Sequence, residues 1–343
     1  MKPRRVSTML MGLGTVNVGW LKIQKTKTEA IRRIHNLEFK IIAIADSSGA
    51  ATNPEGWSAD ELIKLKSDKR KVKDLPDFVQ GVTCLEIVNR VQMDLLIESS
   101  PASLVNGEPG LSMVRTALSR GVNVVLANKT PLVFAFDELN SLSLEHGGRI
   151  AYSATVCGGL PVVNVLKRDL KLASLKRIRG IFNATSNFVL REMENGGTLA
   201  DAVREAQSLG AAEADPSHDL NGHDTANKLF IIMKSFTSFQ GTIRDIRTEG
   251  IQSITSDMLL QARSRGKIIK LLAEAVPNGN GWSLSIRPAE LPRESFLGSC
   301  EGWEMGFEIE TDLYEKICMK NYEADPLGTS AAVMRDCLEV LGA

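Results

Sequence analysis

The stretch VSTMLMGLGTVNVG, residues 6–19, decides the fold of the first half of this chain. Its first six residues form an apolar run that is typical of a buried strand, and the periodic residues after the glycines predict a helix. A glycine turn between a strand and a helix lets the backbone approach a pyrophosphate, whose charge the helix N-terminus favours. The stretch therefore predicts a dinucleotide-binding unit, in which the residues nearest the nucleotide are Gly12, Gly14, Thr15 and Val16.

Three further positions bear on the nucleotide. Asn17 stands where the usual fingerprint has its third glycine, so the turn alone is a weak signal. Asp46 ends the next predicted strand, where a carboxylate can bond a ribose 2′-hydroxyl and repel a 2′-phosphate, which favours NAD over NADP. The alternative is that Asp46 only caps a turn with residues 47–49. Ser99 follows the third predicted strand and is a further expected nucleotide contact.

The rest of the first half repeats the same alternation of strand and helix. Apolar runs predict strands buried on both faces at residues 6–11, 39–45, 93–98 and 122–127. Helices are predicted at residues 15–35, 109–120 and 130–146. This pattern predicts a Rossmann-type, doubly wound α/β sheet with right-handed crossovers. Residues 47–80 are polar, Lys-rich and poorly periodic, and we interpret them as a long insertion or mobile excursion.

The second half predicts an α+β domain. Strands are expected at residues 175–182, 267–276, 283–291, 305–311 and 313–320, and helices at residues 198–209, 222–239 and 328–341. We expect residues 1–150, completed by the final helix at 328–343, to form the dinucleotide-binding domain. Residues 151–327 are then the substrate-binding and catalytic domain.

Composition excludes several classes of partner. Lysine plus arginine (41) balances aspartate plus glutamate (41), so no field gathers nucleic acid or an anionic membrane. The five cysteines are scattered without a CxxC pair, which indicates a reducing compartment and argues against a disulfide framework or zinc. The N-terminus does not read as a signal peptide. We expect a soluble, cytoplasmic protein.

The densest chemistry lies in EADPSHDLNGHDTANK, residues 213–228. Asp224 and Lys228 are four residues apart on a predicted helix, so they share a face, and either Asp219 or Asn221 is expected to cap that helix. A partly buried lysine can donate a proton to a carbonyl oxygen while hydride reaches the carbon. The alternative is an ordinary surface ion pair. Three carboxylates in the preceding loop favour chemistry, whereas His218 and His223 are interpreted as solvent-facing or substrate-edge residues.

A second lysine, Lys129, follows the strand predicted at residues 122–127, at the edge where open α/β sheets bind ligands. The alternative is a plain helix N-terminal loop with Pro131 in the first turn.

Taken together these segments resemble the homoserine dehydrogenases over most of the chain. The resemblance is carried by GLGTVNVG (12–19), ANKTPL (127–132), ATVCGGLP (154–161), FNATSNFVL (182–190), EAQSLGAAEADPSHDLNGHDTANKL (205–229) and EGIQSITSDMLLQARSRGKIIKLL (249–272). It implies reversible reduction of L-aspartate 4-semialdehyde to L-homoserine with NAD(P)H, a step of threonine and methionine biosynthesis.

The resemblance also implies roles for individual residues. Glu213 and Asp219 would hold the substrate amino group, with Thr185 also in the substrate site. Lys228 would act as acid and base on the hydroxyl oxygen, oriented by Asp224, and Lys129 would lie beside nicotinamide and substrate.

A monovalent cation such as Na⁺ and a homodimer are implied as well. The cation would be held by backbone groups of Val156, Gly158 and Leu160, and two copies would pair through the second domain. Because the chain ends near the close of the catalytic domain, threonine feedback through an ACT-type domain is not expected.

Four departures from the family pattern leave the substrate open. Ala211 replaces a tyrosine, Ala184 replaces a glycine, Ser153 replaces a glutamate, and residues 321–325 replace a glycine-rich loop. One alternative is a paralogue that acts on another aldehyde or alcohol, and another is a nucleotide sensor without turnover. A third is nucleophilic catalysis by Cys157.

Overall fold

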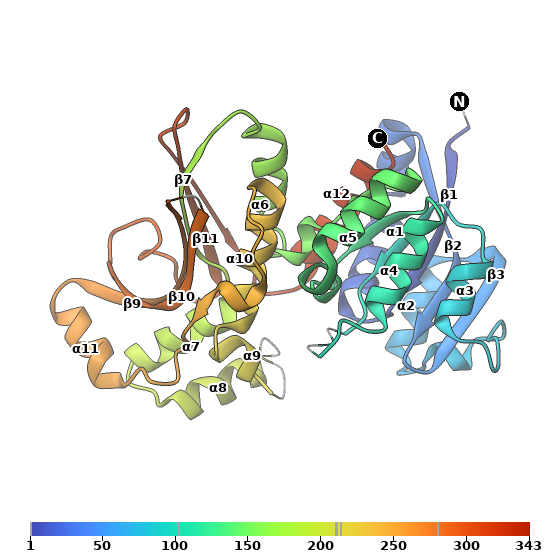
Figure 1. Ribbon diagram of the computed structural model, residues 1–343. Coiled ribbons are helices and arrows are strands. Elements are labelled where there is room, and N and C mark those ends of the chain that lie inside the picture. Colours follow the sequence, from blue (N-terminus) through green and yellow to red (C-terminus); the bar gives the residue numbers. More distant parts are fainter. Residues whose placement is uncertain (1, 102, 104, 210–211, 213–214, 280) are drawn as a thin grey trace. The chain divides into compact units, whose positions relative to one another are not determined.

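The computed structural model describes residues 2–101, 103, 105–209, 212, 215–279 and 281–343. It contains two compact units, Met1–Gly159 with Pro326–Ala343 and Leu160–Asp325 (Figure 1). The sequence placed the boundary after residue 150. In the structure β6 (Ile150–Ala151) pairs with the neighbouring strand of the first sheet, and the first unit extends to Gly159. Among the described residues, no helix is both long and apolar enough to cross a membrane.

The first unit is built on one six-stranded sheet with the order β3-β2-β1-β4-β5-β6. The strands are β1 (Arg4–Met11), β2 (Leu37–Asp46), β3 (Gly49–Trp57), β4 (Leu95–Glu98), β5 (Asn123–Leu126) and β6. All neighbours are parallel except β2 and β3, which are antiparallel. Met11 pairs with Ala45 on one side and with Glu98 on the other, so the carboxyl ends of three strands meet at one edge. This is the Rossmann-type sheet that the sequence predicted.

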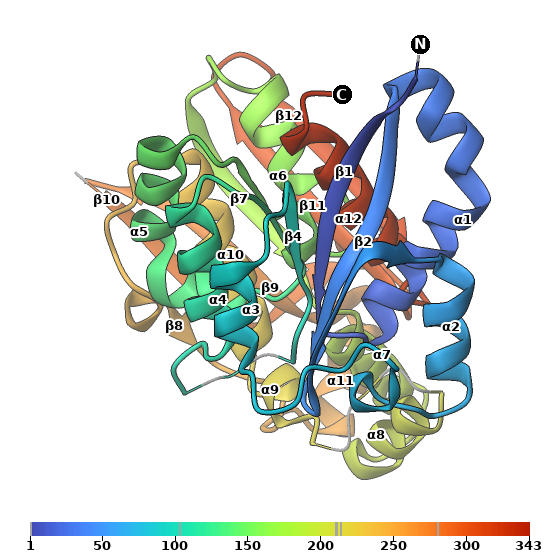
Figure 2. The same ribbon diagram turned by 90° about the vertical axis from the view of Figure 1, so that its right-hand side faces the viewer.

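Helices cover both faces of this sheet. They are α1 (Thr15–His35), α2 (Ala59–Ser67), α3 (Cys84–Arg90), α4 (Gly110–Ser119), α5 (Thr130–His146) and α12 (Leu327–Val340), with short 3-10 turns η1 (Val72–Asp74) and η2 (Ser153–Thr155). α1 packs between α2 and α12, and α4 packs between α3 and α5. Figure 2 shows α1 and α2 on one side of β1 and β2, with α3, α4 and α5 on the other.

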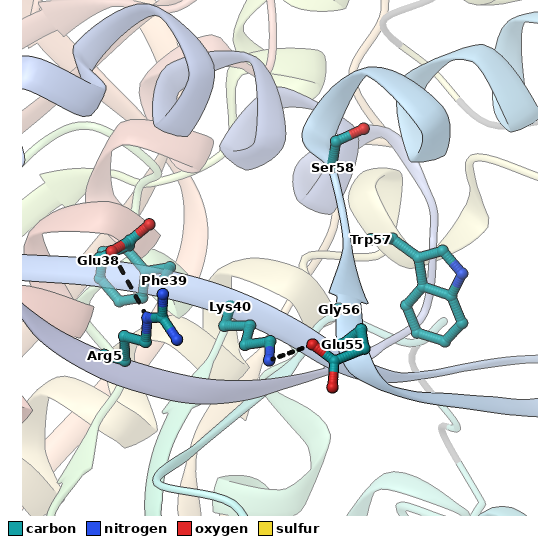
Figure 3. Close-up of a pocket in the computed structure, with 8 residues that line it drawn as sticks. All are labelled: Arg5, Glu38, Phe39, Lys40, Glu55, Gly56, Trp57 and Ser58. Atoms are coloured by element: carbon teal, nitrogen blue, oxygen red, sulfur yellow. Dashed lines mark ion pairs between the residues drawn. The ribbon is translucent and has the colours of Figure 1, made fainter.

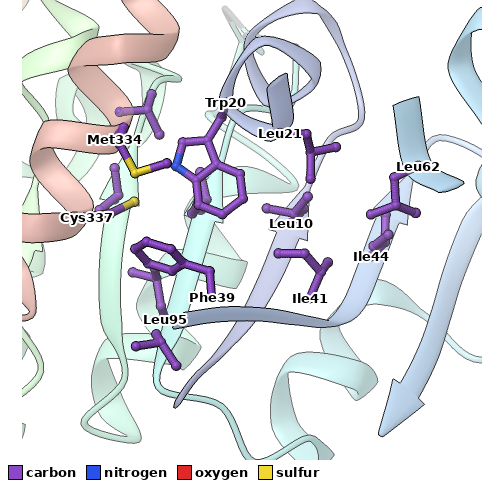
Figure 4. Packing of buried hydrophobic residues seen from close by; sticks show 14 of the residues in the cluster. Leu10, Trp20, Leu21, Phe39, Ile41, Ile44, Leu62, Leu95, Met334 and Cys337 are labelled. Carbon is purple, nitrogen blue, oxygen red and sulfur yellow. The ribbon is translucent and has the colours of Figure 1, made fainter. Parts of the chain in front are cut away.

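The core of this unit joins residues from both ends of the chain. Trp20 of α1 is fully buried and meets Phe39 of β2 edge-on, with ring centroids 5.3 Å apart. Met334 and Cys337 of α12 belong to the same cluster (Figure 4). The C-terminal helix is therefore part of the nucleotide-domain core, because it buries apolar side chains that α1 alone would leave exposed.

The interpretation of residues 47–80 as an insertion or mobile excursion is wrong. The segment contains β3, which pairs with β2, and α2, whose first turn is closed by a capping box between Ser58 and Glu61. Leu62, Leu65 and Val72 are buried and anchor the segment to the core. These few apolar positions were not recognised in the sequence, because the more numerous lysines around them give the segment a polar composition.

The second unit is an α+β arrangement, as predicted. Its sheet has the order β12-β11-β7-β9-β10-β8 and is antiparallel except for the β8–β10 pair. The strands are β7 (Leu175–Ile181), β8 (Arg247–Thr248), β9 (Lys267–Asn278), β10 (Gly281–Pro292), β11 (Glu304–Thr311) and β12 (Lys316–Tyr322). The helical segments are α6 (Val162–Asn164), the π-helical η3 (Val165–Asp169), α7 (Ala184–Glu194), α8 (Leu199–Ser208), α9 (Ser217–Leu220), α10 (His223–Phe236), the 3-10 turn η4 (Ile243–Asp245) and α11 (Ser256–Ser264). α7, α10 and α11 pack on β9.

Candidate active site

The glycine turn of the first unit leaves room for a ligand at one of its two glycines. Gly12 has φ +82°, and a Cβ there would lie 2.8 Å from the carbonyl oxygen of Ser99. Gly14 is the N-cap of α1, and a Cβ there would meet nothing within 4 Å. Gly12 is therefore required by the packing of the chain itself. Gly14 keeps an open space beside the first N–H groups of the helix, those of Thr15 and Val16, as a bound phosphate requires.

Asn17 replaces a glycine without opening this turn. Its buried Nδ2 donates to the carbonyl oxygen of Gly12 over 2.6 Å, so the side chain ties the turn to α1. The close helix packing that the third glycine usually permits occurs two residues later. A Cβ at Gly19 would lie 2.2 Å from Oγ of Ser330 on α12. The departure at Asn17 thus leaves a turn whose residues fit a dinucleotide.

Asp46 is already engaged in the turn that follows β2. Its Oδ1 accepts from the N–H of Ser48 over 2.7 Å, and its Oδ2 accepts from the N–H of Val72 over 3.1 Å. The main-chain N–H of Lys73 donates to Oγ of Ser48 over 3.1 Å. The turn-capping alternative is thus present in the structure. These bonds also bring the Lys-rich main chain of residues 71–73 against the end of β2, where a Rossmann-type sheet receives the ribose.

A buried carboxyl organises the next part of this edge. Glu98 ends β4 and is fully buried, and burial raises its pKa to about 7 although bonds from Ser100 and Asn128 oppose the rise. Asn128 in turn accepts from the N–H and the hydroxyl of Thr130, over 3.0 and 2.8 Å. Lys129 lies between Asn128 and Thr130 in the chain and is the N-cap of α5. The sequence did not single out Glu98, although an acid that ends an apolar run was the available signal.

The pair of Asp224 and Lys228 lies inside the second unit. Nζ of Lys228 is 2.7 Å from Oδ2 of Asp224, and the two side chains are 13% and 6% exposed. Nζ also donates to the carbonyl oxygen of Phe182 over 2.7 Å. The alternative of an ordinary surface ion pair is therefore wrong, because almost no solvent reaches either group. A buried ion pair costs several kcal/mol to desolvate and persists only with such additional bonds.

Asn183 connects this pair to the neighbouring acid. Its Nδ2 donates to Oδ1 of Asp219 over 2.7 Å and to Oδ2 of Asp224 over 2.9 Å. Its Oδ1 accepts from the N–H of Ser186, so Asn183 is also the N-cap of α7. One amide thus fixes both carboxylates relative to Lys228. The sequence analysis gave Asn183 no role of its own. Its place directly before a helix was the signal that could have identified it.

The expected cap of α10 by Asp219 or Asn221 is wrong. The N-cap is Gly222 with φ +81°, and a Cβ there would lie 3.1 Å from a methyl of Ile286. Asp219 belongs instead to the short helix α9, and its carboxylate turns toward Asn183. The packing of the chain against β10 therefore selected a glycine where sequence statistics favour an acid or an amide.

The remaining predicted residues of the substrate site are Thr185, Glu213 and the histidine of α9. Thr185 is 8% exposed in the first turn of α7, next to Ala184. Glu213 and Ala211 lie outside the described residues. Nε2 of His218 is 3.3 Å from Nδ2 of Asn227, the residue of α10 that precedes Lys228.

The loop expected to hold a cation begins at Ser153 in η2. Asp336 of α12 bonds the hydroxyl of Ser153 and accepts from the N–H of Ala154 over 3.3 Å. Burial raises the pKa of Asp336 to about 6. Cys157 and Gly158 then turn the chain with φ of +55° and +53°. Val156 and Cys157 are buried, which disfavours Cys157 as a nucleophile that a substrate must reach.

Figure 3 shows a surface pocket of the first unit. This pocket lies at the opposite end of β1 from the glycine turn. It is lined by Arg5, Glu38, Phe39, Lys40, Glu55, Gly56, Trp57 and Ser58. Arg5 lies near the start of β1 and Gly12 follows its end, which separates them by about 23 Å along an extended strand. Arg5 faces Glu38 at 3.9 Å and Lys40 faces Glu55 at 3.7 Å, so its charges are balanced within the pocket.

Comparison with known proteins gives a consistent result. Residues 161–338 match the family model for homoserine dehydrogenase, and residues 26–124 match the model for glutamate/leucine/phenylalanine/valine dehydrogenase. The chain is 32% identical to a homoserine dehydrogenase of Methanocaldococcus jannaschii over 97% of both chains. It is 29% identical to an NAD(+)-dependent homoserine dehydrogenase of Pseudomonas canavaninivorans, over 96% of this chain and 95% of the relative.

Solved structures agree. A putative homoserine dehydrogenase of Archaeoglobus fulgidus matches with a TM-score of 0.87 and 32% identity, covering 98% of this chain and 99% of that one. A hyperthermophilic archaeal homoserine dehydrogenase in complex with NADPH matches with a TM-score of 0.83 and 27% identity, covering 98% of each chain.

The two glycines of the turn should respond differently to alanine. Gly12→Ala should lower the free energy of unfolding by about 1–3 kcal/mol, because it strains a positive φ and meets the Ser99 carbonyl. Gly14→Ala should leave the melting temperature almost unchanged and weaken binding of reduced nucleotide by about tenfold or more, since the methyl fills the open space. Thermal melts and fluorescence titration with NADPH test both. Equal nucleotide affinity in Gly14→Ala and the unmodified protein would remove this turn from the nucleotide site.

Proposed function

Because this chain belongs to the homoserine dehydrogenase family, we propose that it interconverts L-homoserine and L-aspartate 4-semialdehyde. It is an NAD(P)-dependent oxidoreductase that acts on a hydroxyl group. The observation that carries the substrate proposal is the buried pair of Asp224 and Lys228, held by Asn183. Such a centre can move a proton at an alcohol oxygen without competition from water.

Lys228 is the proposed acid and base. In the direction of oxidation its neutral amine takes the proton of the substrate hydroxyl, and in the direction of reduction its ammonium returns that proton to the oxygen. A nicotinamide nucleotide, when bound, would accept or supply the hydride. The carboxylate of Asp224, 2.7 Å from Nζ, stabilises the ammonium and orients it together with the Phe182 carbonyl.

The acids around this centre are proposed to bind the substrate amino group. Asp219 accepts one bond from Asn183, and a carboxylate with several lone pairs can accept from an ammonium as well. Glu213, outside the described residues, is proposed as its partner, and Thr185 as a further contact. Lys129, beside the Glu98 network of the first unit, is proposed to lie at the nicotinamide and to support proton transfer.

Removing the amine should slow turnover strongly. Lys228→Ala should lower kcat for homoserine oxidation by about 100- to 10,000-fold, because no group then accepts the hydroxyl proton. Absorbance of reduced nucleotide, followed with homoserine and either NAD or NADP, gives the rate. Lys234→Ala on the same helix is the matched control and should keep the rate of the unmodified protein.

Other outcomes of this assay identify the alternatives. Silence with homoserine but turnover of another aldehyde or alcohol would favour a paralogue with changed specificity. Saturable binding of reduced nucleotide without turnover on any such substrate would favour a nucleotide sensor. Full activity in Lys228→Ala would contradict the proposed role of the lysine.

We further propose that the chain accepts both NAD and NADP. Asp46 at the end of β2 favours the ribose hydroxyls of NAD. The exposed Lys71 and Lys73 flank Val72, whose N–H bonds Asp46, and their cations suit a 2′-phosphate. Relatives of both kinds support this, one named NAD(+)-dependent and one solved with NADPH.

Charge reversal at these lysines should separate the two nucleotides. The double variant Lys71→Glu/Lys73→Glu should lower kcat/KM for NADP by about tenfold or more and change that for NAD by less than about twofold. Lys27→Glu is the control, since this exposed residue lies about 18 Å along α1 from Thr15. An equal loss for both nucleotides would show that the lysines do not read a 2′-phosphate.

A monovalent cation such as Na⁺ is proposed at the backbone of Val156, Gly158 and Leu160. The family resemblance carries this proposal, and positive φ at residues 157 and 158 turns the chain sharply beside the proposed ligands. Activity that is identical in Na⁺ and in a bulky organic cation would end this proposal. The expected effect of Na⁺ is a higher rate or a higher melting temperature.

A homodimer through the second unit is proposed as well. Ion pairs between Arg177 and Glu274 and between Arg179 and Glu308 line one face of its sheet, and Glu308 is only 3% exposed. A second copy could cover this face. Sedimentation that gives only the monomer mass would contradict the dimer. We place the reaction in cytoplasmic threonine and methionine biosynthesis, as the family resemblance implies. The scattered cysteines support a reducing compartment, and cell fractionation tests it.

A further inference from the structure

A lysine that the proposed reaction does not use is buried in the second unit. Lys270 of β9 is 1% exposed and belongs to the largest fully buried side chains. Its Nζ donates to Oδ1 of Asn187 over 2.7 Å and to the carbonyl oxygen of Cys300 over 2.5 Å. On the same strand Ile268 and Leu272 form an apolar cluster with Cys300. An apolar residue of similar size would be less costly to bury here, so the ammonium calls for an explanation beyond stability.

Asn187 links Lys270 to main-chain carbonyl groups on another segment of the second unit. Because the lysine takes its oxygen, the amide Nδ2 is directed at three carbonyl oxygens. These belong to Cys300, Gly302 and Glu304, at 3.3, 2.9 and 3.2 Å. One ammonium thus sets the orientation of an amide that joins α7 to residues 300–304, which lead into β11.

α7 connects Asn187 to the catalytic pair. Asn187 and Asn183 are one helical turn apart, and the N–H of Asn187 donates to the carbonyl oxygen of Asn183 over 3.3 Å. Nδ2 of Asn183 donates to the carboxylates of both Asp219 and Asp224, and Asp224 forms the ion pair with Lys228. A rotation or shift of α7 by a few tenths of an ångström would change both bonds from Asn183.

We propose that Lys270 is a positioning residue for the proton-transfer centre, acting through Asn187 and α7 on the amide of Asn183. The proposal rests on the proposed function for the meaning of that centre. The ammonium holds α7 in the rotation at which Asn183 reaches both carboxylates. Lys270 itself touches neither substrate nor nucleotide in this account.

The charge state of Lys270 gives the proposal a signature. Burial, the largest cause, lowers its pKa to about 8, while Cys300, Glu194 and Glu301 favour the charged form and Arg191 opposes it. As the pH rises through about 8 the ammonium loses a proton and its hold on Asn187 weakens. The pH profile of kcat should therefore contain an ionisation near this value that disappears when the lysine is replaced.

The test compares two lysines of one strand. Lys270→Met keeps the length of the side chain and removes its ammonium, and Lys267→Met removes a lysine that is 45% exposed and paired with Glu290. Lys270→Met should lower kcat by about 10- to 100-fold, remove the ionisation near pH 8, and leave nucleotide affinity within about twofold. Hydrogen exchange of the amides of residues 184–194 should become faster in this variant. Lys267→Met should resemble the unmodified protein in every measurement.

The result that overturns the proposal is a folded Lys270→Met with unchanged kcat, pH profile and α7 exchange. A uniform loss of rate at every pH with unchanged exchange would also overturn it, since that describes packing alone. If Lys270→Met does not fold, Asn187→Ala takes its place, and it should give the same faster exchange and lost ionisation. Exchange is read without substrate, so failure of the unmodified protein to oxidise homoserine would end the proposed function and leave this test standing.

Discussion

The buried ion pair between Asp224 and Lys228 is the constraint on which the second unit depends. Two charges removed from water are stable together only if the remaining bonding capacity of each is used, and removing one partner of such a pair costs about 3–5 kcal/mol. The structure meets this demand with the carbonyl of Phe182 at the end of β7 and the amide of Asn183 at the start of α7. The junction between that strand and helix is therefore placed by electrostatics as much as by apolar packing.

The first unit prepares its part of the site largely with groups of the main chain. Its glycine turn offers backbone N–H groups and an open space at Gly14, and the side chain of Asn17 bonds to the carbonyl oxygen of Gly12. The buried Glu98 fixes the loops on either side of it through Ser100 and Asn128. Each unit thus prepares in its own contacts the part that we propose for it: nucleotide binding at the glycine turn in one, and proton transfer at Lys228 in the other.

The success of the sequence analysis followed the range of the interactions involved. The bounds of α1 and α5 were predicted at both ends, because apolar periodicity and the residues at helix ends are local signals. Residues 47–80 were misjudged because a few buried positions, such as Leu62, are outnumbered by exposed lysines. The cap at Gly222 was missed because it depends on Ile286 in a strand far along the chain.

In the candidate site, too, local contacts were predicted and contacts between residues distant in the sequence were not. The pairing of Asp224 with Lys228 followed from their spacing on a helix, whereas the roles of Asn183 and Lys270 depend on partners 41 and 83 residues away. No periodic pattern encodes such contacts. At Asp46 a local motif predicted a contact to the ribose of the nucleotide. The bonds from Ser48 and Val72 show that this carboxylate also caps the turn after β2.

The central claim is that the amine of Lys228 meets the reacting oxygen, and a crystal structure with homoserine and oxidised nucleotide tests it most directly. The account predicts the substrate hydroxyl within hydrogen-bond distance of Nζ of Lys228, and the substrate amino group against Asp219. A complex in which the hydroxyl lies elsewhere, with Nζ of Lys228 making no contact to the substrate, would contradict the account and reduce the buried pair to a structural element.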